Sequence, residues 1–187
     1  IIAHRGVPET FLEHSRPSYL AGVREGADFI EPDVIATKDG HLIVRHENEI
    51  GHTTDVDERA KFAGRKTTKV VDGVELTGWF SEDFTLAELK TLRTRERIPE
   101  LRPKNKRLAG VEQILTFDEV LEIQATENAR RGATAPQVGV YVETKHPTYF
   151  AAAGFDLNEM LLAALDRFDL NRPDAPVIIQ SMETRNL

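Results

Sequence analysis

Two carboxylates separated by a single residue are the first sign of chemistry: Glu31 and Asp33 lie within the apolar segment 29–35. Alternate side chains of a strand leave the same face, so both carboxylates point toward one place. Such a buried pair needs a cation, and hard divalent ions such as Ca²⁺ and Mg²⁺ take carboxylate oxygens as ligands. Glu143 offers a third oxygen. An exposed strand edge would also hold such a pair, but the apolar neighbours favour burial.

Two histidines each follow a short apolar run: His4 comes after residues 1–3 and His46 closely follows residues 42–44. Imidazole titrates near neutral pH and can both accept and donate a proton, so the pair suits general acid–base catalysis. A single histidine more often makes an ordinary structural hydrogen bond, but the shared position at strand ends favours a catalytic role. His14 is a candidate supporting residue.

Two cations occupy the same strand ends: Arg5 follows His4, and Lys145 lies two residues after Glu143. The planar guanidinium of arginine suits bidentate contact with phosphate oxygens, so a phosphate ligand is implied. The alternative is that both cations only neutralise the neighbouring carboxylates. Neither GxxxxGK[ST] nor GxGxxG occurs in the sequence, which argues against ATP or NAD as a cofactor.

The composition narrows the class of protein. The chain has 187 residues, a net charge of −7 and no cysteine. The negative charge argues against nucleic acid as a partner, and the sequence lacks the ~20 consecutive apolar residues of a transmembrane segment. We expect residues 1–3 to form a buried strand, and a buried first strand without a preceding Met is what removal of a leader peptide would leave. This favours a periplasmic or secreted location, with the cytoplasm left open, and no oligomeric state follows.

Strands and helices must bring these residues together. The hydrophobic pattern predicts strands over 1–3, 29–35, 42–44, 138–143 and 177–179, and helices over 16–26, 116–129 and 158–168. Residues 38–40 form a hairpin-like turn. Capping boxes start helices at Thr116 and, within a polar insertion at about 50–110, at Thr85. In barrels and open sheets of this α/β class, catalytic groups gather at the carboxyl ends of the strands.

The order of the motifs resembles the glycerophosphodiester phosphodiesterase family over nearly the whole chain. The matching segments are AHRG (3–6), LEHS (12–15), GADFIEPDV (26–34), TKDG (37–40), RHE (45–47), TTDV (53–56), VETK (142–145) and QS (180–181). Residues 54–92 resemble the helical insertion of the glycerol-phosphodiesterase branch. Leu12 departs from the pattern, because the family has proline there.

The resemblance implies a TIM barrel of the (β/α)8 type, formed by one domain over residues 1–187. It also implies metal-dependent hydrolysis of a small-molecule glycerophosphodiester to sn-glycerol 3-phosphate and an alcohol. The substrate's own hydroxyl would attack first, through a cyclic phosphate. The implied roles are catalysis by His4 and His46, metal binding by Glu31, Asp33 and Glu143 with Ca²⁺ or Mg²⁺, phosphate binding by Arg5 and Lys145, and lining of the site by Glu13 and Gln180. The assignment of acid and base to the two histidines stays open.

The length limits this comparison. The sequence holds about six strands, whereas a full barrel takes ~250 residues and eight strands. We therefore expect open sheet edges. Either further C-terminal sequence or a second subunit would cover them, and we favour further C-terminal sequence. Two other functions stay open: a phospholipase-type relative that acts on membrane lipid, and a non-catalytic module that binds phosphodiesters or metal.

Overall fold

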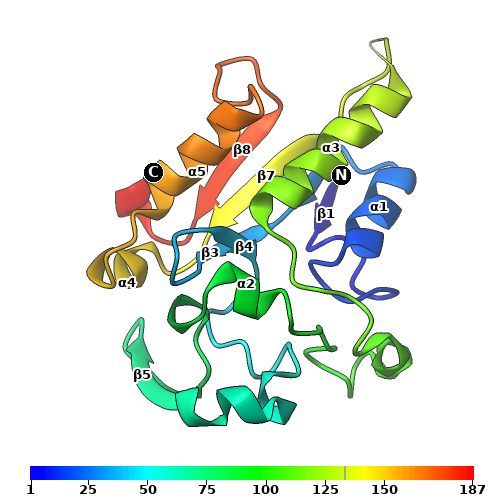
Figure 1. Cartoon of the computed structure of the whole chain (residues 1–187). Coiled ribbons are helices and arrows are strands. Elements are labelled where there is room, and N and C mark those ends of the chain that lie inside the picture. Colours follow the sequence, from blue (N-terminus) through cyan, green and yellow to red (C-terminus); the bar gives the residue numbers. More distant parts are fainter. Residues whose placement is uncertain (133) are drawn as a thin grey trace.

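Six short strands form one largely parallel sheet in the computed structural model, which describes residues 1–132 and 134–187. The order is β1-β2-β7-β3-β4, and β8 pairs with the other side of β7 (Figure 1). The strands are β1 (Ile2–His4), β2 (Phe29–Glu31), β3 (Asp33–Ala36), β4 (Leu42–Val44), β7 (Gly139–Thr144) and β8 (Val177–Ser181). The expected segment 29–35 is thus two strands, because Pro32 lacks the N–H that a continuous ladder requires.

Five α-helices flank the sheet or connect its strands (Figure 1). They are α1 (Arg16–Arg24), α2 (Leu86–Leu89), α3 (Phe117–Arg131), α4 (Pro147–Ala152) and α5 (Leu157–Arg167). The capping boxes predicted at Thr85 and Thr116 are both present. At the start of α3, the Glu119 N–H donates to the Thr116 hydroxyl at 3.1 Å, and the Thr116 N–H donates to the Glu119 carboxylate at 2.7 Å.

The core lies between the sheet and the helices that cover it. Ile30, Val34 and Val140 on the strands are fully buried, as are Tyr19 on α1 and Phe117 on α3. Burial of each such side chain contributes about 1.5–3 kcal/mol, which is enough to hold short strands at a fixed register. The carboxyl ends of β7 and β8 point toward the insertion, which lies beyond that edge of the sheet (Figure 1).

Several local expectations differ from the structure. The first strand is an exposed edge strand and not a buried one: Ile1 is 80 % exposed and Ile2 is 47 % exposed. In addition, α4 was not expected. By contrast, the hairpin-like turn expected at residues 38–40 is confirmed, because β3 and β4 form an antiparallel hairpin.

The insertion is less helical than the family resemblance implied. Its only α-helix in the described part of the chain is α2, and the other turns are short 3-10 segments. It also contains an antiparallel hairpin that the polar composition concealed, formed by β5 (Thr67–Val71) and β6 (Val74–Gly78). Asp72 and Gly73 join the two strands with φ of 49° and 81°, the conformation that a two-residue hairpin turn favours.

The sheet does not close into a barrel within residues 1–132 and 134–187. Among these residues β1 pairs only with β2 and β8 only with β7, while β4 pairs with β3 and, on its other side, makes only an isolated bridge between Ile43 and Thr116. The open edges that the short length predicted are therefore present. No helix of the described residues combines the length and the apolar character needed to cross a bilayer.

Candidate active site

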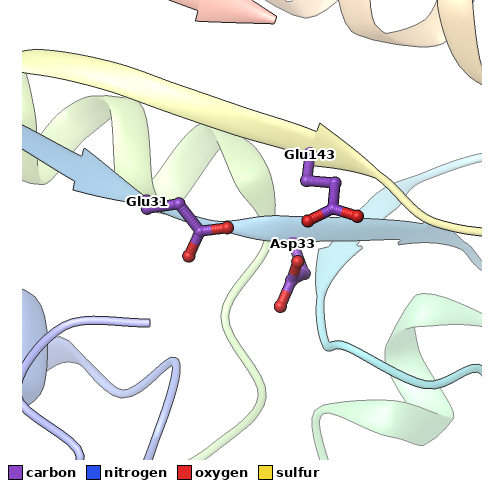
Figure 2. Close-up of side chains that lie close together, drawn as sticks. All are labelled: Glu31, Asp33 and Glu143. Atoms are coloured by element: carbon purple, nitrogen blue, oxygen red, sulfur yellow. The ribbon is translucent and has the colours of Figure 1, made fainter. Parts of the chain in front are cut away.

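Three carboxylates converge where neighbouring strands meet (Figure 2). Glu31 ends β2, Asp33 begins β3, and Glu143 lies near the end of β7, directly opposite Asp33 in the parallel register. All three are buried, and each offers an oxygen within 4.8 Å of the others. The expected convergence of Glu31, Asp33 and Glu143 is therefore present.

The break at Pro32 sets this geometry. On one side of the break β2 pairs with β1, and on the other side β3 pairs with β4, while both strands pair with β7. The Glu143 N–H donates to the Pro32 carbonyl oxygen at 2.9 Å, which ties β7 to the point of interruption. Glu31 and Asp33 are two residues apart, so both reach the same side of the sheet.

The chemistry of the three carboxylates fits a hard divalent ion. Burial, followed by the charge of Asp33, raises the pKa of Glu31, so the three carboxylates resist being ionised together. The Oδ1 atom of Asp33 is buried and has no hydrogen-bond partner among the described residues. An ion bound by these oxygens would relieve the repulsion and satisfy that atom. The donor set is the type that Ca²⁺ and Mg²⁺ prefer.

Asp33 is held in place by a buried network. His14 Nε2 lies 3.0 Å from Asp33 Oδ2, and His14 Nδ1 lies 2.7 Å from the Tyr19 hydroxyl. Arg5 Nε lies 3.2 Å from the same Asp33 oxygen. Burial alone would raise the pKa of Asp33, but the hydrogen bond and charge of His14 and the charge of Arg5 lower it. Burial also lowers the pKa of His14. His14 is therefore the supporting residue that the sequence suggested.

Arg5 and Lys145 both lie at the carboxylates. The Arg5 backbone N–H donates to Glu31 Oε2 at 2.9 Å, from a residue whose φ is 58°, in the left-handed region. Lys145 Nζ donates to Glu143 Oε1 at 2.7 Å. The ion pair of Lys145 with Glu143, like that of Arg5 with Asp33, is the charge neutralisation expected as the alternative to phosphate binding. These contacts place both cations at the metal-ligating candidates.

The two residues expected to line the site also touch it. Gln180 Nε2 donates to Glu143 Oε2 at 2.8 Å, which orients that carboxylate. Glu13 Oε2 lies 3.5 Å from Arg5 Nη1 and 3.9 Å from Arg102 Nη1. Glu13 is thus a buried counter-ion for arginines at the rim of the site.

The two histidines lie at the accessible rim. His4 ends β1 opposite Glu31 and is exposed, while His46 is partly exposed. Partial burial lowers the pKa of His4, and the charges of Arg5 and His46 lower it further. The charge of Asp33 acts on His4, and the charge of His46 acts on Asp33, so both rings lie within electrostatic reach of the carboxylates.

Sequence reasoning missed three residues here. His46 Nδ1 lies 2.7 Å from Glu47 Oε1, and Arg97 Nη1 donates to the same Glu47 oxygen at 2.6 Å. Arg45 is buried, with two guanidinium nitrogens unpartnered among the described residues, and burial lowers its pKa. Glu47 could have been found from its position beside His46. Arg97 lies in an irregular polar segment with no pattern to reveal it.

A family model described as "Glycerophosphoryl diester phosphodiesterase family" matches residues 4–187. A glycerophosphodiester phosphodiesterase of Arabidopsis thaliana is 41% identical over 149 residues, which are 79% of this chain and 37% of that protein. Another of Bacillus subtilis is 31% identical over 190 residues, which are 100% of this chain and 53% of that protein. The chain thus spans about half the length, or less, of these curated relatives.

Solved structures show the same fold. A glycerophosphodiester phosphodiesterase from Agrobacterium tumefaciens matches with a TM-score of 0.64 and 19% identity, over 99% of this chain and 58% of that one. A phosphodiesterase from Oleispira antarctica, solved in complex with the product sn-glycerol-3-phosphate, matches with a TM-score of 0.65 and 20% identity, over 98% and 57%. The fold is therefore of the expected TIM-barrel type, and the described sheet is an open part of it.

Proposed function

Because the chain belongs to the glycerophosphoryl diester phosphodiesterase family, we propose that it hydrolyses glycerophosphodiesters to sn-glycerol 3-phosphate and an alcohol with the help of a divalent metal ion. One observation carries the proposal. The buried carboxylates of Glu31, Asp33 and Glu143 meet at the strand ends from which two histidines and two cations also project. This combination serves attack on a phosphodiester, which needs charge neutralisation and two proton transfers.

The metal site would consist of Glu31, Asp33 and Glu143, and we propose Ca²⁺ or Mg²⁺ as the ion. When bound, such an ion withdraws electron density from the phosphate and stabilises the negative charge of the transition state. Gln180 keeps one Glu143 oxygen oriented through its hydrogen bond. The arrangement is pre-organised, because strand backbone and buried side chains fix every donor.

Arg5 and Lys145 bind the phosphate group in this proposal. In the structure each cation is paired with a carboxylate, Arg5 with Asp33 and Lys145 with Glu143. Their positive charge is therefore already held where a phosphate would approach the carboxylates. Both side chains are nearly buried, so a poorly screened environment strengthens their attraction for developing negative charge.

The surroundings of the two histidines suggest which is the base and which is the acid. His4 suits the general base, because its lowered pKa favours the neutral ring that accepts the proton of the nucleophile. His46 is then the general acid that donates to the leaving alcohol, with its Nδ1 atom held 2.7 Å from the Glu47 carboxylate.

The direct test is an assay of the purified protein with glycerophosphocholine, with Mg²⁺ or Ca²⁺ and with a chelator. We expect metal-dependent release of sn-glycerol 3-phosphate, and its loss in Glu143→Gln. The matched control is Glu122→Gln, which changes an exposed carboxylate on α3. Substrate binding without product would identify a non-catalytic module, and cleavage of membrane lipid alone would identify a phospholipase. Either result contradicts the proposal.

A further inference from the structure

We propose that Arg97, in the insertion, is a positioning residue for His46 and acts through Glu47. The inference rests on the proposed function, because it takes His46 as an acid–base group. It adds a residue from the insertion to a site whose proposed metal ligands and catalytic histidines lie on or near the strands of the sheet.

The contacts form a short chain from Arg97 to the imidazole. Arg97 Nη1 donates to Glu47 Oε1 at 2.6 Å, and His46 Nδ1 lies 2.7 Å from that same oxygen. One carboxylate oxygen thus holds both the guanidinium and the ring. A carboxylate that is itself fixed holds the ring in one orientation, as outer-shell partners do in other sites.

A second carboxylate anchors the other side of the guanidinium. Arg97 Nε lies 3.3 Å from Glu13 Oε2, and Arg5 Nη1 lies 3.5 Å from the same atom. The Glu13 side chain is only 2% exposed, so this attraction is weakly screened. Arg97 therefore links the histidine at the rim to the arginine that contacts Asp33.

The backbone around Arg97 is also fixed. The Arg95 N–H donates to the Thr53 carbonyl oxygen at 2.9 Å, and the Ile98 N–H donates to Glu96 Oε1 at 3.1 Å. Glu96 is buried and accepts a further hydrogen bond from Asn105 at 2.9 Å. Arg97 thus projects from a supported segment, which is what precise positioning of a partner requires.

The charges explain what the residue changes. Burial raises the pKa of Glu47, but the hydrogen bond and charge of His46 and the charges of Arg97 and Arg5 lower it to about 2. Glu47 is therefore ionised throughout the neutral range. The charged or titratable groups that act on His46 or on its partner include Glu47, Arg97, Arg5, Arg45, His4 and Asp33. Without Arg97, more of the Glu47 charge would act on His46, and the ring would hold its proton to higher pH.

The test combines kinetics with NMR titration of the His46 ring in the Mg²⁺-loaded protein. In Arg97→Gln we expect the His46 titration midpoint to rise by about one pH unit, as loss of a nearby like charge predicts. We also expect kcat for glycerophosphocholine to fall about 10-fold, part of the usual acid–base contribution, with KM nearly unchanged. Arg97→Lys keeps the charge beside Glu47 and should restore most of the wild-type midpoint.

The control is Arg95→Gln, two residues away in the same segment, because Arg95 pairs with Asp57 instead. It should move neither the midpoint nor kcat. In a Glu47→Gln background, Arg97→Gln should add no further change, as a double-mutant cycle requires of residues that act through one another. An unchanged midpoint in Arg97→Gln, a midpoint in Arg97→Lys as far displaced as in Arg97→Gln, or additive losses in the cycle would overturn the inference. If wild-type protein releases no product, the proposed function fails, which is a different result from failure of this inference.

Discussion

Asp33 is shared by three partners at the site. His14 and Arg5 contact one of its oxygens, and the other oxygen lies 3.9 Å from Lys145 Nζ. The residue has no exposed surface, so each of these partners offsets part of the cost of burying its charge. Changes to the partners of Asp33 should therefore affect both stability and catalysis.

The two histidines give the sharpest test at this scale. His4→Ala and His46→Ala should each lower turnover of glycerophosphocholine by roughly 10²-fold or more, because each removes one proton transfer. Metal binding, measured by calorimetry, should persist in both variants, since neither ring is a proposed ligand. His41→Ala is the control, because His41 is exposed and pairs only loosely with Asp39. Near-normal turnover in both variants would refute the roles given to these histidines.

Tyr19 contacts His14 on the side of the ring away from Asp33. Its hydroxyl lies 2.7 Å from His14 Nδ1, and it donates to the Glu31 carbonyl oxygen at 3.5 Å. Tyr19→Phe should lower the free energy of unfolding by about 1–3 kcal/mol, because it leaves a buried nitrogen unpaired. Urea denaturation measures this change, with Tyr141→Phe on β7 as the control. Equal stability of the two variants would show that the hydroxyl is not needed.

The sequence predicted these residues unevenly. Glu31, Asp33 and Glu143 were recognisable because acidic side chains in buried strands are unusual and because the strand period places the first two on one face. Arg97 was not, since its partners Glu13 and Glu47 lie far away in the chain. No local pattern encodes an ion pair between such distant segments.

At the scale of elements, capping predicted helix starts well. Thr116 and Glu119 satisfy each other's backbone N–H groups at the first turn of α3. Thr116→Ala should lower the free energy of unfolding by about 1 kcal/mol, because it removes the side-chain cap. Thermal or urea unfolding checks this value, with Thr10→Ala in an exposed loop as the control. A loss no larger than that of the control would contradict the role of the cap.

Glu88 of α2 makes the insertion sensitive to acid. Its hydrogen bonds to Arg65 lower the pKa of Glu88 from 4.5 to about 2. A folded-state pKa below the unfolded one adds stability above about pH 4.5, and this stability is lost as the pH falls toward about 2. Wild-type protein should therefore exceed Glu88→Gln in stability at neutral pH, with the difference vanishing in acid. Urea unfolding at several pH values checks this, and a difference that does not vary with pH would contradict it.

The missed elements had weaker signals. The β5–β6 hairpin is mostly exposed, so it lacks the apolar alternation of a half-buried strand. Its turn residues Asp72 and Gly73 were nevertheless a usable sign, because Asp-Gly favours a tight hairpin. The strand predicted over 29–35 was right in position, but Pro32 divides it because proline cannot donate to the ladder.

At the scale of the whole molecule, the like charges of Glu31, Asp33 and Glu143 bring repulsion to the point where β2, β3 and β7 meet, and a bound cation would offset it. Binding of Mg²⁺ or Ca²⁺ should therefore raise the midpoint of thermal unfolding. At about 100 times the dissociation constant, the gain is ~2.7 kcal/mol for an ion that binds only the folded state. A chelator should reverse the shift, and Asp33→Asn should abolish it. An equal shift in wild type and variant would place the ion elsewhere.

The sheet as a whole followed the expected plan. A largely parallel sheet with helices and strand-end side chains was predictable from the alternation of elements, and the open edges were predictable from the length. Which strands become neighbours was not, because pairing of β7 with both β2 and β3 depends on contacts between distant segments.

The origin of Glu47's ionic partner in the insertion has an evolutionary consequence. The three carboxylates come from the six-stranded sheet, whereas Arg97 comes from a segment that could be exchanged without altering any strand of that sheet. Natural selection could thus change proton transfer by His46 by replacing that segment, while the three carboxylates proposed to bind the metal ion stay unchanged. Chimeras that exchange residues 50–110 between relatives would measure whether proton transfer and metal binding can change independently.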